Sequence, residues 1–155
     1  MLRVTTLCLA LLAAACGAPQ PEAPAAQTSA GLTIGDAWAT ATPGGVDVSA
    51  GYLAVTNPGA EADRLVGART PRAERVELHS MSMTDGVMSM QQVDAFDVPA
   101  GGALQLAPGG NHLMFIGVSE PFAVDEEISV TLQFEHAGAV ELTLPVRTSA
   151  RGGGH

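Results

Sequence analysis

The feature that most constrains the fold of this chain is the alternation of apolar and polar residues in short segments separated by turn residues. An alternation with a period of two is typical of half-buried β-strands, and no long segment has the spacing of an amphipathic helix. Turn signals rich in Gly, Pro, Asn and Asp interrupt the pattern, as at Asn57-Pro58-Gly59 and Asp85-Gly86. We therefore expect strands near residues 32–38, 49–56, 64–69, 74–83, 87–94, 103–107, 111–117, 128–135 and 139–146.

Many short strands at this spacing predict an all-β fold, an antiparallel Greek-key barrel or sandwich. A chain of 155 residues is long enough for a single domain with tails. We place this domain at residues 32–147. The Ala- and Pro-rich residues 16–31 are expected to form a tether, and the Gly-rich residues 148–155 a flexible tail.

The N-terminal residues 1–15 have the pattern of an export signal. Arg3 precedes an apolar run from Val4 to Ala15, which is too short to span a bilayer. Three alanines lead into Cys16, which resembles a bacterial lipoprotein signal in which the cysteine becomes the lipidated first residue; the alternative is ordinary cleavage that leaves Cys16 free. We expect a periplasmic or other extracytoplasmic protein that is anchored to the membrane through Cys16.

The composition excludes several classes of function. Cys8 lies in the signal and Cys16 at the mature terminus, so the domain itself contains no cysteine for a disulfide, a thiolate metal site or a redox pair. An electron-transfer site of the blue-copper type needs a cysteine ligand and is therefore disfavoured. The formal net charge is −9 and all seven basic residues are arginine without a basic stripe, so we expect no nucleic-acid partner.

Five of the six methionines lie between Met81 and Met114. Asp85-Gly86 favours a type I′ hairpin turn, which would set Met83 opposite Met88 and Met81 opposite Met90. Because every second residue of a strand shares a face, these four methionines and His79 would project from one side of the hairpin.

A second segment carries the same residue types. His112 and Met114 would share one face of a strand, with Leu113 and Phe115 on the other face. Thioether sulfur is a soft ligand and imidazole a borderline one, so the combination favours Cu(I) over Zn²⁺, Mg²⁺ or Ca²⁺. Taken singly, each methionine could instead fill a core and each histidine could be an ordinary surface residue.

The four residues His79, Met90, His112 and Met114 are separated by ten, twenty-one and one residues. This spacing closely resembles the signature of the PCuAC family of extracytoplasmic bacterial copper chaperones. Further similar stretches are Asp36-Ala37-Trp38, Gly51-Tyr52, Asp63-Arg64-Leu65, Val76-Glu77-Leu78-His79, Gly86-Val87-Met88 and Pro108-Gly109-Gly110.

The resemblance implies a cupredoxin-like β-barrel that binds one Cu(I) through His79, Met90, His112 and Met114. It also implies delivery of copper to the CuA centre of cytochrome c oxidase or a related respiratory oxidase, with an apo CuA domain and a thioredoxin-like copper or thiol protein as partners. Some family members carry a His- and Met-rich C-terminal extension, whereas this tail ends in a single His155. We interpret Met81, Met83 and Met88 as an outer transfer surface.

The sequence leaves two other functions open. A periplasmic copper storage or detoxification protein would need the same ligands, and a β-sandwich lipoprotein could bind a partner without any metal. We expect a monomer that is not an enzyme, because the sequence alone supports no acid/base pair or nucleophile.

Overall fold

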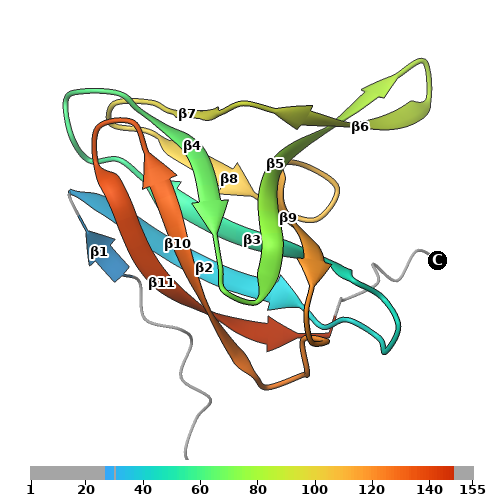
Figure 1. Ribbon diagram of the computed structural model, residues 1–155. Coiled ribbons are helices and arrows are strands. Elements are labelled where there is room, and N and C mark those ends of the chain that lie inside the picture. The colour runs from blue at the N-terminus through green and yellow to red at the C-terminus, as the bar shows by residue number, and fades with distance from the viewer. Residues whose placement is uncertain (1–26, 30, 149–155) are drawn as a thin grey trace, which may run out of the picture.

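The computed structural model describes residues 27–29 and 31–148, and these residues form strands joined by turns (Figure 1). Each strand predicted from the sequence is present, with ends within two residues of the expected ones. No helix in this described part is long and apolar enough to cross a membrane. The strands are β1 (Gln27–Ser29), β2 (Leu32–Thr40), β3 (Val48–Thr56), β4 (Asp63–Arg69), β5 (Ala73–Thr84), β6 (Val87–Val93), β7 (Phe96–Val98), β8 (Ala103–Leu106), β9 (His112–Val118), β10 (Glu127–Phe134) and β11 (Gly138–Arg147).

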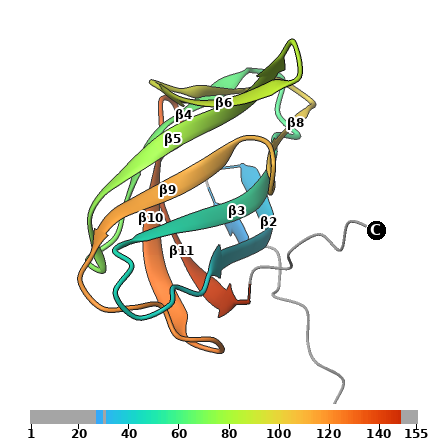
Figure 2. The same ribbon diagram turned by 90° about the vertical axis from the view of Figure 1, so that its right-hand side faces the viewer.

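Seven of the strands close into a barrel. Their order is β2-β11-β10-β4-β5-β9-β3, and the pairing of β3 with β2 completes the circle. The pair β11–β2 is parallel and the other pairs around the circle are antiparallel, so the barrel is mixed. The all-β barrel expected from the sequence is thus confirmed. Figure 2 shows β5, β9 and β3 lying side by side across one face.

Two short strands were not expected from the sequence. β1 pairs with β2 and lies at the end of the segment interpreted as a tether, while β7 pairs with β4. Strands of three residues are too short for a periodic pattern to be recognised. The signal at 1–15, Cys16 and the tail that ends in His155 lie outside the described residues, apart from Thr148.

The core follows from the alternation along the strands. Leu113 and Phe115 of β9 are fully buried inside the barrel, as is Leu53 of β3. Gly51 of β3 lies beside them, and a Cβ atom there would be only 2.8 Å from the Phe115 ring. Since real Cβ atoms do not come so close to a neighbour, the glycine allows β3 and β9 to pack tightly under the outer face that carries the candidate site.

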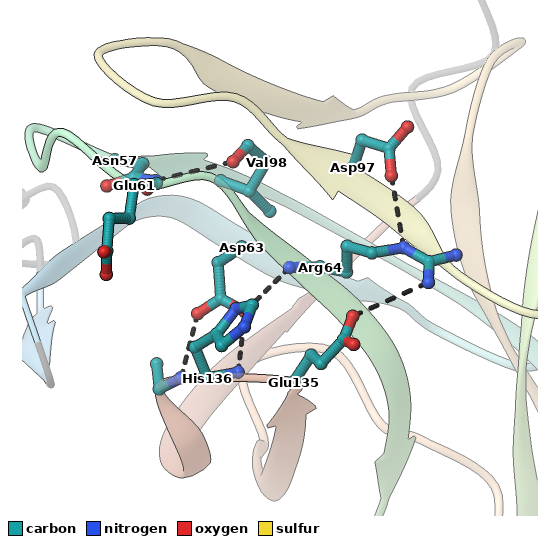
Figure 3. Close-up of polar contacts among 9 residues, drawn as sticks. Asn57, Glu61, Asp63, Arg64, Asp97, Val98, Glu135 and His136 are labelled. Atoms are coloured by element: carbon teal, nitrogen blue, oxygen red, sulfur yellow. Dashed lines mark hydrogen bonds and ion pairs between the residues drawn. The ribbon is translucent and has the colours of Figure 1, made fainter.

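A buried carboxylate fastens the turn between β10 and β11 to β4 (Figure 3). Asp63 accepts hydrogen bonds from the backbone N–H groups of Arg64 at 2.7 Å, His136 at 2.9 Å and Ala137 at 2.9 Å. Burial works to raise the pKa of Asp63, but these hydrogen bonds outweigh it and hold the pKa below its ordinary value. The carboxylate therefore stays ionised and ties two distant parts of the barrel together.

Candidate metal site

The hairpin of β5 and β6 has the register predicted from its turn. Met83 lies opposite Met88, and Met81 lies opposite Met90. Asp85 and Gly86 have φ values of 53° and 79°, and a type I′ turn requires positive values at both positions. The two methionine pairs thus share one face of the hairpin.

Strand β9 lies against the other edge of β5 and brings the second segment to the first. His112 is the direct cross-strand partner of His79, and Met114 is the partner of Glu77. Between them, Leu78 and Leu113 form a pair whose side chains are buried in the core. Because side chains alternate across a strand, the two histidines project from the outer face of the barrel.

The ring of His79 is held by a carboxylate on its own strand. Its Nε2 atom lies 2.8 Å from Oε2 of Glu77, whose other oxygen accepts a bond of 2.8 Å from Nε of Arg75. The bond from His79, followed by that from Arg75, holds the pKa of Glu77 below its ordinary value. An ionised carboxylate only accepts hydrogen bonds, so Nε2 of His79 carries the proton and donates it.

This arrangement leaves the other nitrogen of the His79 ring available. Within the part of the chain that the structure describes, Nδ1 of His79 is buried and has no hydrogen-bond partner. A buried polar atom without a partner costs free energy, and in native proteins it often marks a binding role. In the neutral ring Nδ1 has a lone pair, which is the form that ligates a metal.

The ring of His112 is held at the opposite nitrogen from that of His79. Its Nδ1 atom lies 3.0 Å from the carbonyl oxygen of Gly110, so Nδ1 carries the proton and Nε2 keeps the lone pair. The centroids of the His79 and His112 rings are 5.7 Å apart. Such hydrogen bonds to the second ring nitrogen fix the orientation of metal-binding histidines.

A surface hollow of about 340 Å³ lies next to these rings. Met90, His112 and Met114 line it together with Ala50 of β3, the cross-strand partner of Met114. Tyr52 forms part of the wall, with its ring centroid 6.5 Å from that of His112. His79 does not line the hollow but lies beside it, next to His112.

The structure therefore brings the residues of the expected ligand set to one place on the outer face. They offer two imidazoles, each with one nitrogen held and one available, and two thioethers. Among residues 27–29 and 31–148, no three His, Cys, Asp or Glu side chains cluster in a way that could hold a metal ion. The available donors are neutral and partly soft, which fits Cu(I) better than a hard divalent cation.

Some residues of the site were missed at the sequence level. Glu77 lies two positions before His79 on the same face of β5, so the period of two could have identified it. Gly110 and Tyr52 belong to stretches that resemble the PCuAC family, but periodicity does not reveal their roles at the site, because these depend on the path of a loop and on the order of the strands.

Comparison with known proteins decides the family. A family model described as "Putative lipoprotein LpqE-like" matches residues 32–146. The chain belongs to this LpqE-like family. It is 33% identical over 152 residues to "Putative lipoprotein Lxx21020" from Leifsonia xyli subsp. xyli, a match that covers 95% of this chain and 90% of the relative.

Solved structures place the fold of this LpqE-like chain with PCuAC domains. The copper-bound PCuAC domain from PmoF2 is 25% identical with a TM-score of 0.70, covering 80% of this chain and 98% of that domain. DR1885 from Deinococcus radiodurans in its Cu(I) form is 27% identical with a TM-score of 0.61, covering 82% and 83% of the two chains. The apo form of DR1885 is 28% identical with a TM-score of 0.62, covering 93% and 99%. The resemblance to PCuAC copper-binding domains noted in the sequence is thus confirmed.

Proposed function

We propose that this LpqE-like protein is an extracytoplasmic Cu(I) carrier that binds one ion through His79, Met90, His112 and Met114. The observation that carries the proposal is the pair of facing imidazoles, each with one nitrogen fixed by a hydrogen bond and one available. Met90 and Met114 line a hollow together with His112, and His79 is the direct cross-strand partner of His112. The Cu(I)-bound structure of DR1885, which has the same fold, supports the choice of metal.

The geometry supports holding copper and releasing it. Hydrogen bonds donated by the rings to the Glu77 carboxylate and the Gly110 carbonyl orient both histidines before the ion arrives, so binding costs little further ordering of these side chains. All four ligands are neutral, which gives a weaker hold than a thiolate would. Met90 is 48% exposed, so a ligand of a partner can displace it first. An exchange with a neutral ligand of a partner needs no proton transfer, while a partner thiol that takes the ion binds as a thiolate and releases its proton; neither exchange changes the oxidation state of copper.

As the recipient we propose the apo CuA domain of cytochrome c oxidase or of a related respiratory oxidase, which binds copper partly through thiols, with a thioredoxin-like copper or thiol protein as a further partner. This assignment follows the resemblance to the PCuAC family. The lipoprotein description of the family and the position of Cys16 support an anchor on the outer side of the membrane. A carrier tethered to the same membrane would reach a membrane-bound oxidase over a short distance.

The test is a titration of the protein with Cu(I) in competition with a chelator, followed by mixing with an apo CuA domain. Trp38 is the single tryptophan, and its ring centroid lies 4.6 Å from that of Tyr52 beside the site, so its fluorescence should report binding. We expect one tight equivalent, weaker binding of Zn²⁺, and transfer to the CuA domain. Tight binding without transfer would favour storage, and absence of binding would favour a lipoprotein that acts without metal.

A further inference from the structure

The β5–β6 hairpin extends beyond the barrel and carries more sulfur than the four-ligand site uses. Figure 1 shows its turn projecting away from the other strands. β6 pairs with β5 alone, so the second edge of β6 has no strand partner among the described residues. Met83 is 69% exposed and Met88 is 51% exposed. Methionines that are so exposed do not fill a core, which is the usual role of this residue.

The hairpin has two chemically different faces. On one face the hydroxyls of Ser82 and Ser89 lie 3.0 Å apart in a cross-strand hydrogen bond. The other face carries the two opposed pairs, Met81 with Met90 and Met83 with Met88. The sulfur atoms are therefore gathered on a single side, which is the side that faces the hollow, because Met90 lines it.

The methionines on this face of the hairpin lie close enough for several of them to bind one ion. Directly opposed residues have Cβ atoms about 4.5–5.5 Å apart, and the unbranched methionine side chain adapts its sulfur position easily. Met83 and Met88 can therefore both turn toward one ion. Met81 lies two residues from Met83 and two from His79 on the same strand face, which corresponds to steps of about 7 Å along the strand.

We propose that Met81, Met83 and Met88 form a second, weaker Cu(I) site at the exposed end of this hairpin, through which the ion passes between the His/Met site and a partner. Three neutral thioethers select a soft monovalent ion, and without an imidazole and with high exposure they hold it less tightly. Between the two sites the ion remains Cu(I) and a departing ligand is replaced by an arriving thioether, so no electron or proton is transferred. A thiol of the partner that then takes the ion replaces a thioether, binds as a thiolate and releases its proton, and the ion still remains Cu(I). The use of this site in transfer rests on the carrier function proposed above.

The deciding experiment uses the full chain with ¹³C-labelled methionine methyl groups, titrated anaerobically with Cu(I). We expect the methyl signals of Met90 and Met114 to move during the first equivalent, and those of Met81, Met83 and Met88 during a second, weaker one. If the second equivalent leaves these three signals unmoved, the second site does not exist. If instead the first equivalent leaves the methyl signals of Met90 and Met114 and the ring signals of His79 and His112 unmoved, the four-ligand site proposed above is wrong. This outcome is distinct from the absence of the second site.

Variants separate a sulfur site from an apolar contact surface. The triple variant M81L/M83L/M88L keeps volume and apolar character but removes the sulfur, so we expect it to bind one equivalent with unchanged affinity and to transfer it several-fold more slowly to an apo CuA domain. The double variant S82A/S89A on the opposite face is the matched control and should transfer at the wild-type rate. Normal transfer by the leucine variant, with slow transfer by M81S/M83S/M88S, would overturn the proposal in favour of an apolar docking surface.

Discussion

His79 on β5 and His112 on β9 lie directly opposite each other, with ring centroids 5.7 Å apart and each ring held at one nitrogen by a hydrogen bond. The partners of these bonds, a carboxylate and a backbone carbonyl, accept but do not donate. Each ring consequently keeps one nitrogen with a lone pair, and His112 lines the hollow together with Met90 and Met114. This pre-oriented pair is the basis of the predictions on metal binding.

Removing any member of the ligand set should weaken Cu(I) binding. We expect His79→Ala and His112→Ala to lower the affinity by more than the roughly 10–100-fold cost of losing a group that only orients a ligand. Met90→Leu and Met114→Leu should also weaken binding while the thermal unfolding midpoint stays near the wild-type value, because leucine conserves volume. The measurement is a competition titration with a Cu(I) chelator. Full affinity in both leucine variants would show that the ligands are wrongly assigned.

Glu77 should act through His79 rather than on the metal. Glu77→Ala removes the acceptor for Nε2 of His79, and we expect Cu(I) affinity to fall by about 10–100-fold. Glu77→Gln keeps an acceptor oxygen and should restore part of the loss. Nitrogen NMR of the His79 ring should show a mixture of tautomers in the alanine variant alone. Glu141→Gln on the exposed face of β11 is the control for loss of one charge. Equal affinity in Glu77→Ala and wild type would exclude the orienting role.

The strands and the hairpin register could be predicted because they depend on local patterns. The alternation of apolar residues identifies each strand of four residues or more, and Asp85-Gly86 alone fixes which methionines face each other. The order of strands around the barrel depends on contacts between distant segments, so the parallel pair β11–β2 could not be predicted from periodicity. The proximity of His79 and His112 was expected from the family spacing, while the hydrogen bond that His112 donates to the Gly110 carbonyl depends on the loop before β9.

Membrane attachment should depend on Cys16. The apolar run that ends in three alanines before this cysteine, together with the lipoprotein description of the family, predicts a diacylated or triacylated mature terminus. Mass spectrometry of the N-terminal peptide from membranes should show the added lipid on Cys16. Cys16→Ser should abolish the modification while leaving the Cu(I) affinity of the domain unchanged. A mature chain that begins at another residue and carries no lipid would contradict this prediction.

Asp63 should stabilise the barrel in a manner that depends on pH. Asp63→Asn replaces an ionised acceptor of three backbone N–H groups, and hydrogen bonds to a charged group contribute about 1.5–3 kcal/mol each. Because the folded pKa lies below the ordinary value of 3.8, this stabilisation is present above about pH 4 and is lost as the pH falls through the folded pKa. Urea unfolding at pH 7 should give a much lower free energy of unfolding for the variant than for the wild type, and at pH 3 the difference should be smaller.

The control for this experiment is a second aspartate, which pairs with the neighbouring Arg64. Asp97→Asn removes an exposed ion pair with Arg64, and we expect a change of less than about 1 kcal/mol in the free energy of unfolding. If Asp63→Asn and Asp97→Asn have equally small effects at pH 7, Asp63 does not fasten the β10–β11 turn to β4.

Copper affinity should fall on acidification, and the imidazoles should be the cause. A protonated ring cannot ligate, so protons compete with Cu(I) for the two imidazoles as the pH falls. Glu77 cannot account for this fall in affinity, because the bonds from His79 and Arg75 lower its pKa and keep it ionised. We therefore expect the Cu(I) affinity of the wild type to drop steadily between about pH 7.5 and pH 5, as measured by chelator competition. The double variant H79A/H112A, which binds through sulfur alone, should show a weak affinity that changes little over the same range, because thioethers do not titrate. A wild-type affinity that stays constant over this interval would argue against histidine ligation at this site.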